Sequence, residues 1–392
     1  MLEQMLPILL VTEHFAPSTG ATAQLMTDLA QGLAREGSEV VVLTATPGPK
    51  LGGGLQVVRL GGTPMPRTSL LAKALRGILF FVGSLCWCLR FGRRGQKVLI
   101  ASNPPFIGLL GPILRFWGFS YVFIFQDLFP RSAVLTGVLP AAGPLTWCWQ
   151  TLMTLVCRQS SRTVVLSEAM EQRLVREFGS DLPVSLIHNW AVEAALPLPR
   201  AQNPFAKELG LESFFTVQYS GNFGRLHDLL TLLEAARLLE CEPIRFLFIG
   251  DGAKVRQIEA YRTGLGLRNV IQLPYQPREK LPESLGACDL AAIGLIPGAE
   301  DTVAPCKFYG ILASGRPVLL VARRTCDLAK LVLAENCGLV VEPGEAALLA
   351  DALRVLQLDK PLVEAMGARS LALYRNRFGI KRSLAAYQAL LQ

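Results

Sequence analysis

The sequence predicts an α/β protein with two domains, each built around a parallel β-sheet. Short apolar runs, which are typical of buried strands, alternate with segments whose apolar residues recur at helical spacing. This alternation starts again after the proline-punctuated stretch 194–200, which indicates a linker. The length of 392 residues also exceeds what one ordinary hydrophobic core holds. We therefore expect a first domain over residues 1–195 and a second over residues 196–375.

The first half begins with a β-α-β pattern. Residues 7–12 predict a buried strand, apolar residues from Leu25 to Leu33 keep helical spacing, and residues 40–44 predict the next strand. Such a unit favours a parallel sheet with helices on both faces. Further strands are expected at residues 98–102, 121–125, 163–167 and 184–189. The glycine-rich residues 51–55 are expected to form a loop.

The second half repeats the alternation and ends in a helical region. Its strands are expected at residues 215–220, 244–249, 270–273, 290–293, 318–321 and 338–341. No Gly-x-Gly-x-x-Gly fingerprint follows the first strand of the chain. This argues against a nicotinamide or flavin site.

The composition favours an anionic partner. The formal net charge is +8, which suits nucleotides, phosphorylated lipids or a membrane face. Nucleic acid is not expected, because there is no dense Lys/Arg tract with interleaved aromatic residues. Nine cysteines without a Cys-x-x-Cys pair, and three histidines, predict free thiols in the cytosol, no metal site and no cofactor.

Targeting segments are not expected. Met1–Leu10 carries no basic region, so we expect no signal peptide. The most apolar segment, Gly77–Leu89, is shorter than the ~20 residues of a membrane-spanning helix.

Residues 303–318 have the pattern of a turn, a short apolar helix and a Gly-x-Pro break before a strand. Pro305 suits the first turn of that helix, because its missing N–H has no partner there. Lys307 would then lie beside backbone N–H groups and the positive end of the helix dipole, which together favour phosphate. The alternative is a surface lysine on an ordinary connection.

Asp127 follows the expected strand 121–125. Ligands of open α/β sheets lie beyond the carboxyl ends of the strands. A carboxylate at this place is either catalytic or a helix N-cap.

Several motifs follow one order along the chain. They are Tyr-Ser-Gly-Asn-Phe-Gly-Arg at 219–225, Phe-Ile-Gly-Asp-Gly at 248–252, Leu-Pro-Tyr at 273–275, and the segment 304–317. In this order they resemble the donor half of glycosyltransferase family 4. The first half agrees through residues 15–20, 102–106 and 126–130. The last of these is similar to the branch that builds bacterial exopolysaccharide, O-antigen and colanic-acid chains.

The resemblance implies the GT-B fold, in which two Rossmann-like, parallel-sheet α/β domains face a central cleft. The C-terminal domain would hold the nucleotide-sugar, and a last helix within residues 376–392 would cross back to the first domain. The family implies transfer of a hexosyl or N-acetylhexosaminyl unit from a UDP- or GDP-sugar, with retention of configuration and without a catalytic metal. The implied acceptor is a polyprenyl-diphosphate-linked glycan, and the implied location is the cytoplasm, at the inner face of the plasma membrane.

The chemistry of such a transfer suggests roles for the matching residues. Breaking the bond between sugar and nucleotide leaves negative charge on a diphosphate, which Arg225 and Lys307 are expected to hold. Gly221 and Gly224 would let backbone N–H groups approach it, and Asp127 would orient hydroxyl groups or move a proton. The other expected donor contacts are Gly20, Asn222, Gly250, Asp251, Gly252, Tyr275, Glu300, Asp301, Tyr309 and Gly310. For residues 250–252 a plain tight turn is the alternative.

The chain departs from the family pattern on the donor side. Thr302 and Gly310 stand where the family has two glutamates eight residues apart, and Glu300 and Asp301 would substitute for them. His227 lies near the place of a usual lysine.

Two other functions stay open. One is a nucleotide-sugar epimerase of the same architecture, which would need several acid or base side chains in the cleft. The other is a non-catalytic nucleotide-sugar-binding protein. Peripheral membrane contact is a further expectation, because the apolar residues from Leu70 to Leu89 are flanked by basic residues from Arg67 to Arg94. The alternative for that segment is a pair of buried helices.

Overall fold

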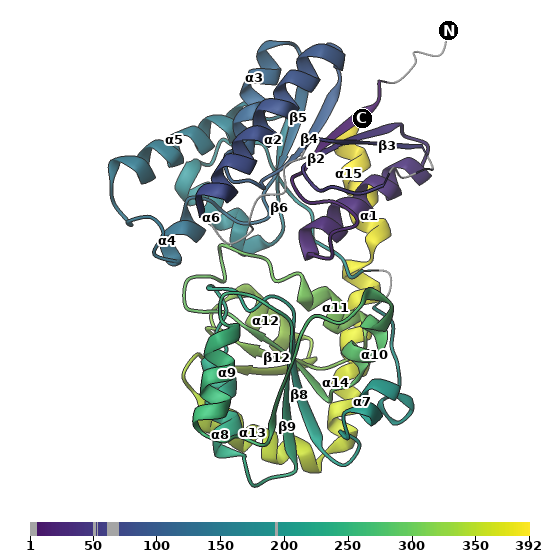
Figure 1. Ribbon diagram of the computed structural model, residues 1–392, viewed down its shortest axis with the longest axis vertical. Coiled ribbons are helices and arrows are strands. Elements are labelled where there is room, and N and C mark those ends of the chain that lie inside the picture. The colour runs from purple at the N-terminus through teal and green to yellow at the C-terminus, as the bar shows by residue number, and fades with distance from the viewer. Residues whose placement is uncertain (1–5, 50–51, 53, 61–69, 193–194) are drawn as a thin grey trace. The chain divides into compact units, whose positions relative to one another are not determined.

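The computed structural model describes residues 6–49, 52, 54–60, 70–192 and 195–392. Its internal contacts divide the chain into two compact units (Figure 1). The first comprises residues 1–188, 302–304 and 381–392, and the second comprises residues 189–301 and 305–380. The division after residue 188 lies a few residues before the boundary expected after residue 195.

The first unit is built on a seven-stranded parallel sheet in the order β3-β2-β1-β4-β5-β6-β7. Its strands are β1 (Ile8–Val11), β2 (Val40–Thr44), β3 (Leu55–Arg59), β4 (Lys97–Ala101), β5 (Ser120–Ile124), β6 (Arg162–Val165) and β7 (Val184–Leu186). Its helices are α1 (Ala21–Arg35), α2 (Leu70–Phe91), α3 (Leu110–Phe116), α4 (Arg131–Leu135), α5 (Pro144–Gln159), α6 (Glu168–Phe178) and α15 (Ile380–Leu391), with a 3-10 turn at Ile107–Leu109. Residues 381–391 of α15 thus belong to the first unit.

The second unit is built on a six-stranded parallel sheet in the order β10-β9-β8-β11-β12-β13. Its strands are β8 (Phe215–Ser220), β9 (Ile244–Ile249), β10 (Val270–Leu273), β11 (Leu290–Gly294), β12 (Val318–Val321) and β13 (Gly338–Val341). Its helices are α7 (Pro204–Glu208), α8 (Leu230–Leu238), α9 (Val255–Gly264), α10 (Leu281–Gly286), α11 (Lys307–Ala313), α12 (Asp327–Ala334), α13 (Ala346–Leu358) and α14 (Lys360–Leu373). The predicted α/β class with two parallel sheets is confirmed.

The strands are buried on both faces, which explains their unbroken apolar runs. All five residues of β2 are buried, as are all four of β12. The exceptions are at sheet edges: β3 has only Leu55 buried, β10 has only Val270 buried, and β7 has no buried residue. Leu55 was expected in a loop, but it begins β3 and pairs with Val40. The sequence of β3, Leu-Gln-Val-Val-Arg, directly follows three glycines and is interrupted by a polar residue, so it has the pattern of a loop.

Helix α2 corrects the expectation that the apolar segment 77–89 is too short to span a membrane. The helix has 22 residues, and its window Ala74–Phe91 has a mean hydropathy of 1.5. Among the described residues it is the one helix long and apolar enough to cross a membrane, by length and composition.

Each sheet reverses its strand order once. In the first sheet this happens between β1 and β4, and in the second between β8 and β11. Ligands of open α/β sheets bind beyond the carboxyl ends of the strands at such a point. The loops that follow β8 and β11 are therefore the first place to look for a site in the second unit.

Candidate functional site

Lys307 lies at the reversal point of the second sheet. It is the first residue of α11, and its Nζ lies 3.4 Å from the ring centre of Tyr219 on β8. Within the described part of the chain, this buried Nζ has no hydrogen-bond partner. Burial lowers the pKa of Lys307 well below its ordinary value. A buried amine without an acceptor is costly, so the arrangement suits an anion whose oxygens reach Nζ.

The charge at this place comes from Lys307 rather than from the helix. Helix α11 begins at Lys307, with Cys306 as N-cap, so Pro305 lies before the helix and not in its first turn as expected. The Pro305 carbonyl accepts a hydrogen bond of 2.9 Å from the Phe308 N–H. With seven residues the helix is short, and its dipole adds little to the charge of an ammonium group.

Two glycine-containing loops, residues 221–224 and 250–252, pack against each other beside Lys307. The Phe223 N–H donates to the Asp251 carbonyl over 2.8 Å. Gly250 has φ +148°, and a Cβ there would lie 1.9 Å from the Gly221 carbonyl oxygen. Only glycine fits such a close approach of two backbones.

The Gly221 N–H is already engaged, because it donates to the Ile249 carbonyl over 2.9 Å. The Gly224 nitrogen lies 3.1 Å from His227 Nδ1, but that Nδ1 also lies within hydrogen-bonding distance of the Asn222 carbonyl oxygen and can bond only one of the two. Gly221 instead leaves room for the lysine, because a Cβ there would lie 3.4 Å from Lys307 Cε. The glycines shape the loops, and the side chain of Lys307 supplies the donor.

His227, near the place of a usual lysine, does not supply a second cation. Burial, together with the charges of Lys307 and Lys254, lowers its pKa to about 3. Its imidazole is therefore neutral at physiological pH, and its Nδ1 lies 2.8 Å from the Asn222 carbonyl oxygen. Arg225, on the same loop, is exposed to solvent.

Glu300 is held by an arginine of its own unit. Its carboxylate accepts hydrogen bonds from Nε and Nη2 of Arg323 over 3.0 and 2.9 Å, and from the Gly298 N–H over 2.7 Å. Burial alone would raise the pKa of Glu300, but these hydrogen bonds outweigh it and keep the pKa below its ordinary value. Asp301 is close enough to Arg323 to raise the pKa of that arginine. Both acids therefore interact with the charge of Arg323, a partner that the sequence did not suggest.

Tyr309 is a core residue rather than an accessible donor contact. It is only 5% exposed, and its ring packs 5.6 Å from that of Phe308 and 5.3 Å from that of Phe378. Its hydroxyl hydrogen-bonds to the backbone of Asn189. Tyr275, in contrast, is 52% exposed on the loop after β10.

The remaining expected donor contacts lie on loops and helix ends. Asn222 and Asp251 are exposed, and Asp251 Oδ1 accepts a hydrogen bond of 2.7 Å from the Gly252 N–H. In α11, Gly310 is half-buried and would have space for a Cβ. In the first unit, Gly20 is the N-cap residue of α1 and offers no side chain.

Asp127 lies beyond the carboxyl end of β5 in the first unit. It pairs as an isolated antiparallel bridge with Val303, and the next residue, Leu128, donates its N–H to the Thr302 carbonyl over 2.9 Å. The helix that follows has Pro130 as its N-cap, without a side-chain hydrogen bond. Asp127 is therefore not the N-cap. Burial raises its pKa to about 6, within reach of neutral pH, as a proton-transfer group requires.

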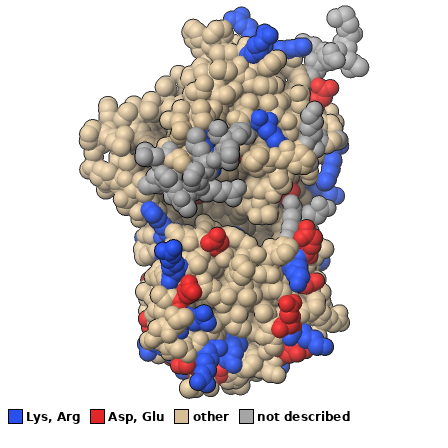
Figure 2. Space-filling model, viewed as in Figure 1, with Lys and Arg blue, Asp and Glu red and all other residues tan. Residues whose placement is uncertain are grey.

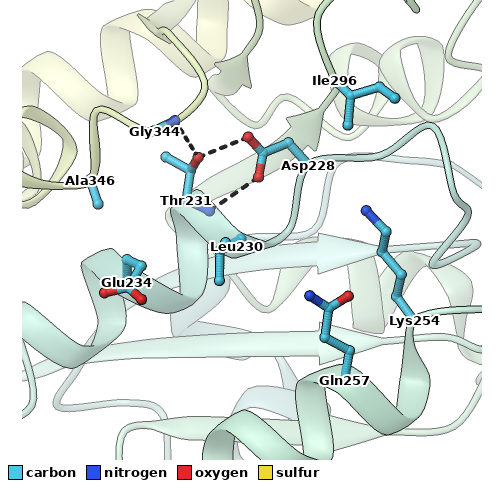
Figure 3. A pocket seen from close by; sticks show the side chains of 9 residues that line it. All are labelled: Asp228, Leu230, Thr231, Glu234, Lys254, Gln257, Ile296, Gly344 and Ala346. Carbon is cyan, nitrogen blue, oxygen red and sulfur yellow. Dashed lines mark hydrogen bonds between the residues drawn. The ribbon is translucent and has the colours of Figure 1, made fainter. Parts of the chain in front are cut away.

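A separate pocket of about 330 Å³ lies between α8, α9 and α13 (Figure 3). The Asp228 carboxylate accepts from the Thr231 N–H and hydroxyl over 3.1 and 2.9 Å, and Thr231 Oγ1 accepts from the Gly344 N–H over 2.8 Å. Lys254 Nζ donates to the His227 carbonyl over 2.5 Å. Asp228, Thr231 and Gly344 are thus bonded to each other, and none of the lining residues is among the expected site residues.

Among the described residues no group of three or more His, Cys, Asp or Glu side chains could hold a metal ion. All nine cysteines are free thiols.

Comparison with known proteins covers both units. Residues 20–190 match the family model of the glycosyl transferase 4-like domain, and residues 202–371 match that of glycosyl transferases group 1. WbjE of Pseudomonas aeruginosa, named as a probable glycosyltransferase, is 29% identical over 66% of this chain and 65% of its own. WcaI of Escherichia coli is 33% identical over 37% of this chain and 36% of its own, and its name assigns it provisionally to glycosyl transfer in colanic acid biosynthesis. The matches thus span less than two thirds of the length of either relative.

Solved structures share the fold at low sequence identity. Sucrose-phosphate synthase from Thermosynechococcus elongatus has a TM-score of 0.79 at 20% identity, over 98% of both chains. HepE from Anabaena, solved with UDP-glucose, has a TM-score of 0.73 at 17% identity, over 98% of this chain and 99% of that one. The two parallel sheets, the ordered motifs and the two family models lead to one conclusion: the chain belongs to glycosyltransferase family 4 and has the GT-B fold.

Proposed function

We propose that this protein transfers a sugar from a nucleotide-sugar donor to a glycan acceptor, as a step in the synthesis of a bacterial cell-surface polysaccharide. Family membership supports the reaction class. The names of WbjE and WcaI support glycosyl transfer, and that of WcaI supports a polysaccharide product. The transferred unit is proposed to be a hexosyl or N-acetylhexosaminyl group.

The observation that carries the proposal is Lys307. Its Nζ is buried at the reversal point of the donor-side sheet, next to Gly221, with no acceptor among the described residues. A donor diphosphate would supply that acceptor, and its charge would keep the amine protonated against the cost of burial. The hydrogen bond strengthens as the sugar leaves, because negative charge grows on the departing phosphate. Arg225, on the exposed loop after β8, would approach the same diphosphate.

We propose a UDP- or GDP-sugar as the donor. HepE, which has the same fold, was solved with UDP and with UDP-glucose. Transfer would proceed with retention of the anomeric configuration and without a metal, since Lys307 and Arg225 would neutralise the leaving diphosphate. Asp127, whose pKa of about 6 lies close to the working pH, would orient the reacting hydroxyl group or move its proton.

The proposed acceptor is a polyprenyl-diphosphate-linked glycan at the cytoplasmic face of the plasma membrane. The name of WcaI supports a polysaccharide product, and the lipid-linked acceptor is what the resemblance to the exopolysaccharide branch implies. The nine free thiols fit a reducing compartment.

The test is a panel of UDP- and GDP-sugars with short lipid-linked acceptors, in buffer with EDTA. We expect transfer from one donor, undiminished by EDTA, to a product whose anomeric proton signals report retained configuration. Interconversion of two sugars without transfer would instead establish an epimerase. Tight nucleotide-sugar binding without any turnover would establish a binding protein.

A further inference from the structure

Three neighbouring helices of the first unit carry an unusual number of exposed apolar side chains. Helix α3 contacts α2 on one side and α5 on the other, so the three form one layer over the sheet (Figure 1). Their outward residues include Ile78 and Val82 on α2, Phe116 and Trp117 at the end of α3, and Trp147 on α5. Phe116 is 86% exposed and Trp147 is 70% exposed. Scattered apolar side chains need no explanation, but a layer of them points to an interaction surface.

The charge of this region is one-sided. Between Val40 and Ser167 the sequence has thirteen Lys and Arg residues and a single acid, Asp127. In Figure 2 the part of the first unit formed by α5 is drawn in tan, without red. Arg93 and Arg94 are exposed just after α2, and Arg115 is exposed on α3. Exposed apolar side chains beside arginines that have few acidic neighbours in the sequence are typical of surfaces that bind anionic membranes.

Helix α2 cannot leave this layer to cross a bilayer, because one side of it is part of the core. Phe80, Ser84 and Cys88, spaced by four residues, are all buried. A Cβ on Gly77 would lie 2.8 Å from the Phe106 ring, and one on Gly92 would lie 2.5 Å from the Phe119 ring. From Gly77 to its end the helix therefore packs one side against the core of the unit and presents the other side.

Aromatic residues lie toward both ends of the layer. Phe91, 61% exposed, ends α2, Phe116 ends α3, and Trp117 is the C-cap residue that follows it. Trp147 lies in the first turn of α5, at the other end of that helix from Arg158. Helices that precede strands of a parallel sheet run against them, so the carboxyl ends of α2, α3 and α5 lie at one edge. Amphipathic aromatic rings at both ends suit a layer that lies flat at the level of lipid headgroups.

We propose that the outer layer formed by α2, α3 and α5 docks flat onto an anionic lipid bilayer. The apolar side chains enter the headgroup region, and the arginines bind anionic headgroups. This inference rests on the first unit alone and does not depend on the proposed transfer reaction.

Flotation with vesicles tests it, using phosphatidylcholine with and without phosphatidylglycerol. We expect the full chain to float with the anionic vesicles at low salt, to float less at high salt, and to stay at the bottom with phosphatidylcholine alone. Brominated lipids should quench tryptophan emission, since Trp117 and Trp147 are exposed while Trp190 is buried.

Two variants locate the contact. Phe116→Ser with Trp117→Ser and Trp147→Ser removes the aromatic anchors, and Arg93→Gln with Arg94→Gln removes charge. Each should lower partitioning into anionic vesicles by about tenfold or more. The matched control, Val355→Ser with Leu358→Ser on α13, changes residues that are 63% and 84% exposed in the second unit, and should leave partitioning unchanged.

Thermal melting of the variants checks that each remains folded. Parent protein that stays at the bottom with anionic vesicles overturns the proposal. So does equal flotation of parent and both variants. If the aromatic variant instead dissociates a dimer of the parent on a sizing column, with no flotation of either, the layer is an interface between two copies of this chain. Flotation uses neither donor nor acceptor sugar, so its result is independent of the transfer assay.

Discussion

The two units differ in the positive charge that bears on their proposed ligands. Three arginines of the second unit are paired with acids: Arg200 with Asp289, Arg323 with Glu300, and Arg354 with Glu242. Lys307 differs, since its buried Nζ has no hydrogen-bond partner within the described residues. In the first unit, exposed arginines follow α2 and α3 in a stretch of sequence with one acid.

This difference separates two kinds of anion recognition. A single buried amine in a rigid frame favours one group at one place, because its desolvation is offset only by a well-placed acceptor. Exposed arginines on helices respond to the average charge of a surface, and salt screens them. Donor binding should therefore be less sensitive to salt than membrane binding.

The largest expected effect concerns Asp127, the one acid of the basic stretch. Asp127→Asn keeps the shape of the side chain but cannot accept a proton, so turnover should fall by about a hundredfold or more. The parent should lose activity as pH falls below about 6, and this acidic limb should be missing from the residual activity of the variant. Initial rates over a pH series decide, and full turnover in Asp127→Asn would contradict the role.

Melting of the same variant gives the control. The folded pKa of about 6 lies above the unfolded value of about 3.9. The protonated form therefore stabilises the fold at low pH, and this stability is lost as pH rises through 6. Asparagine stays neutral, so at about pH 8 the variant should melt at or above the parent temperature, and the two should converge at about pH 4.

Gly252 tests the close packing of the loops 221–224 and 250–252 beside Lys307. Its φ is +147°, and a Cβ there would lie 2.5 Å from Asn222 Oδ1 and 2.8 Å from the Phe223 N–H nitrogen. Gly252→Ala should cost about 1–3 kcal/mol of unfolding free energy and weaken nucleotide binding. Gly264→Ala on α9 is the matched control, because a Cβ there meets nothing within 4 Å, and it should change stability by less than about 1 kcal/mol. If urea unfolding gave the same loss of unfolding free energy for both substitutions, the close packing of the two loops would not be important for stability.

A smaller effect is expected for Glu300. Glu300→Gln weakens the bond to Arg323 and should cost about 1–2 kcal/mol, since half of the Arg323 side chain remains in solvent. The folded pKa is below the unfolded one, so the stabilisation is present above about pH 4.3 and is lost as pH falls through the folded pKa. Chemical denaturation at two pH values measures this. A large loss of kcat with unchanged stability would instead indicate that Glu300 contacts the donor, as the sequence predicted.

Local pattern was enough to predict much of the fold. Strands such as β2 and β12 are apolar runs buried on two sides, and Lys307 lies between the strand β11 and the Gly-x-Pro break that precedes β12. Strand β3 was missed because its short apolar pair follows three glycines, which predict a loop.

Contacts between distant residues could not be read from the sequence. Glu300 and Arg323 are 23 positions apart and lie on opposite sides of α11 and β12 in the sequence, so only the fold brings them together. The aromatic partner of Tyr309, Phe378, lies in the π-helical turn after α14. The loop after β8 looked like a phosphate-binding loop, but the N–H of its Gly221 is bonded to Ile249 on the neighbouring strand β9. Residue type indicates what a side chain can bind, whereas the fold decides what it already binds.

Calorimetric titration with UDP and with GDP, in EDTA, tests the role of Lys307 most directly. The parent should bind one of these nucleotides without a divalent cation, and Lys307→Ala should bind it about a hundredfold more weakly while melting like the parent. Arg93→Gln with Arg94→Gln should leave this affinity unchanged. Equal affinity of the parent and Lys307→Ala, or binding by the parent only when a metal is added, would contradict the account.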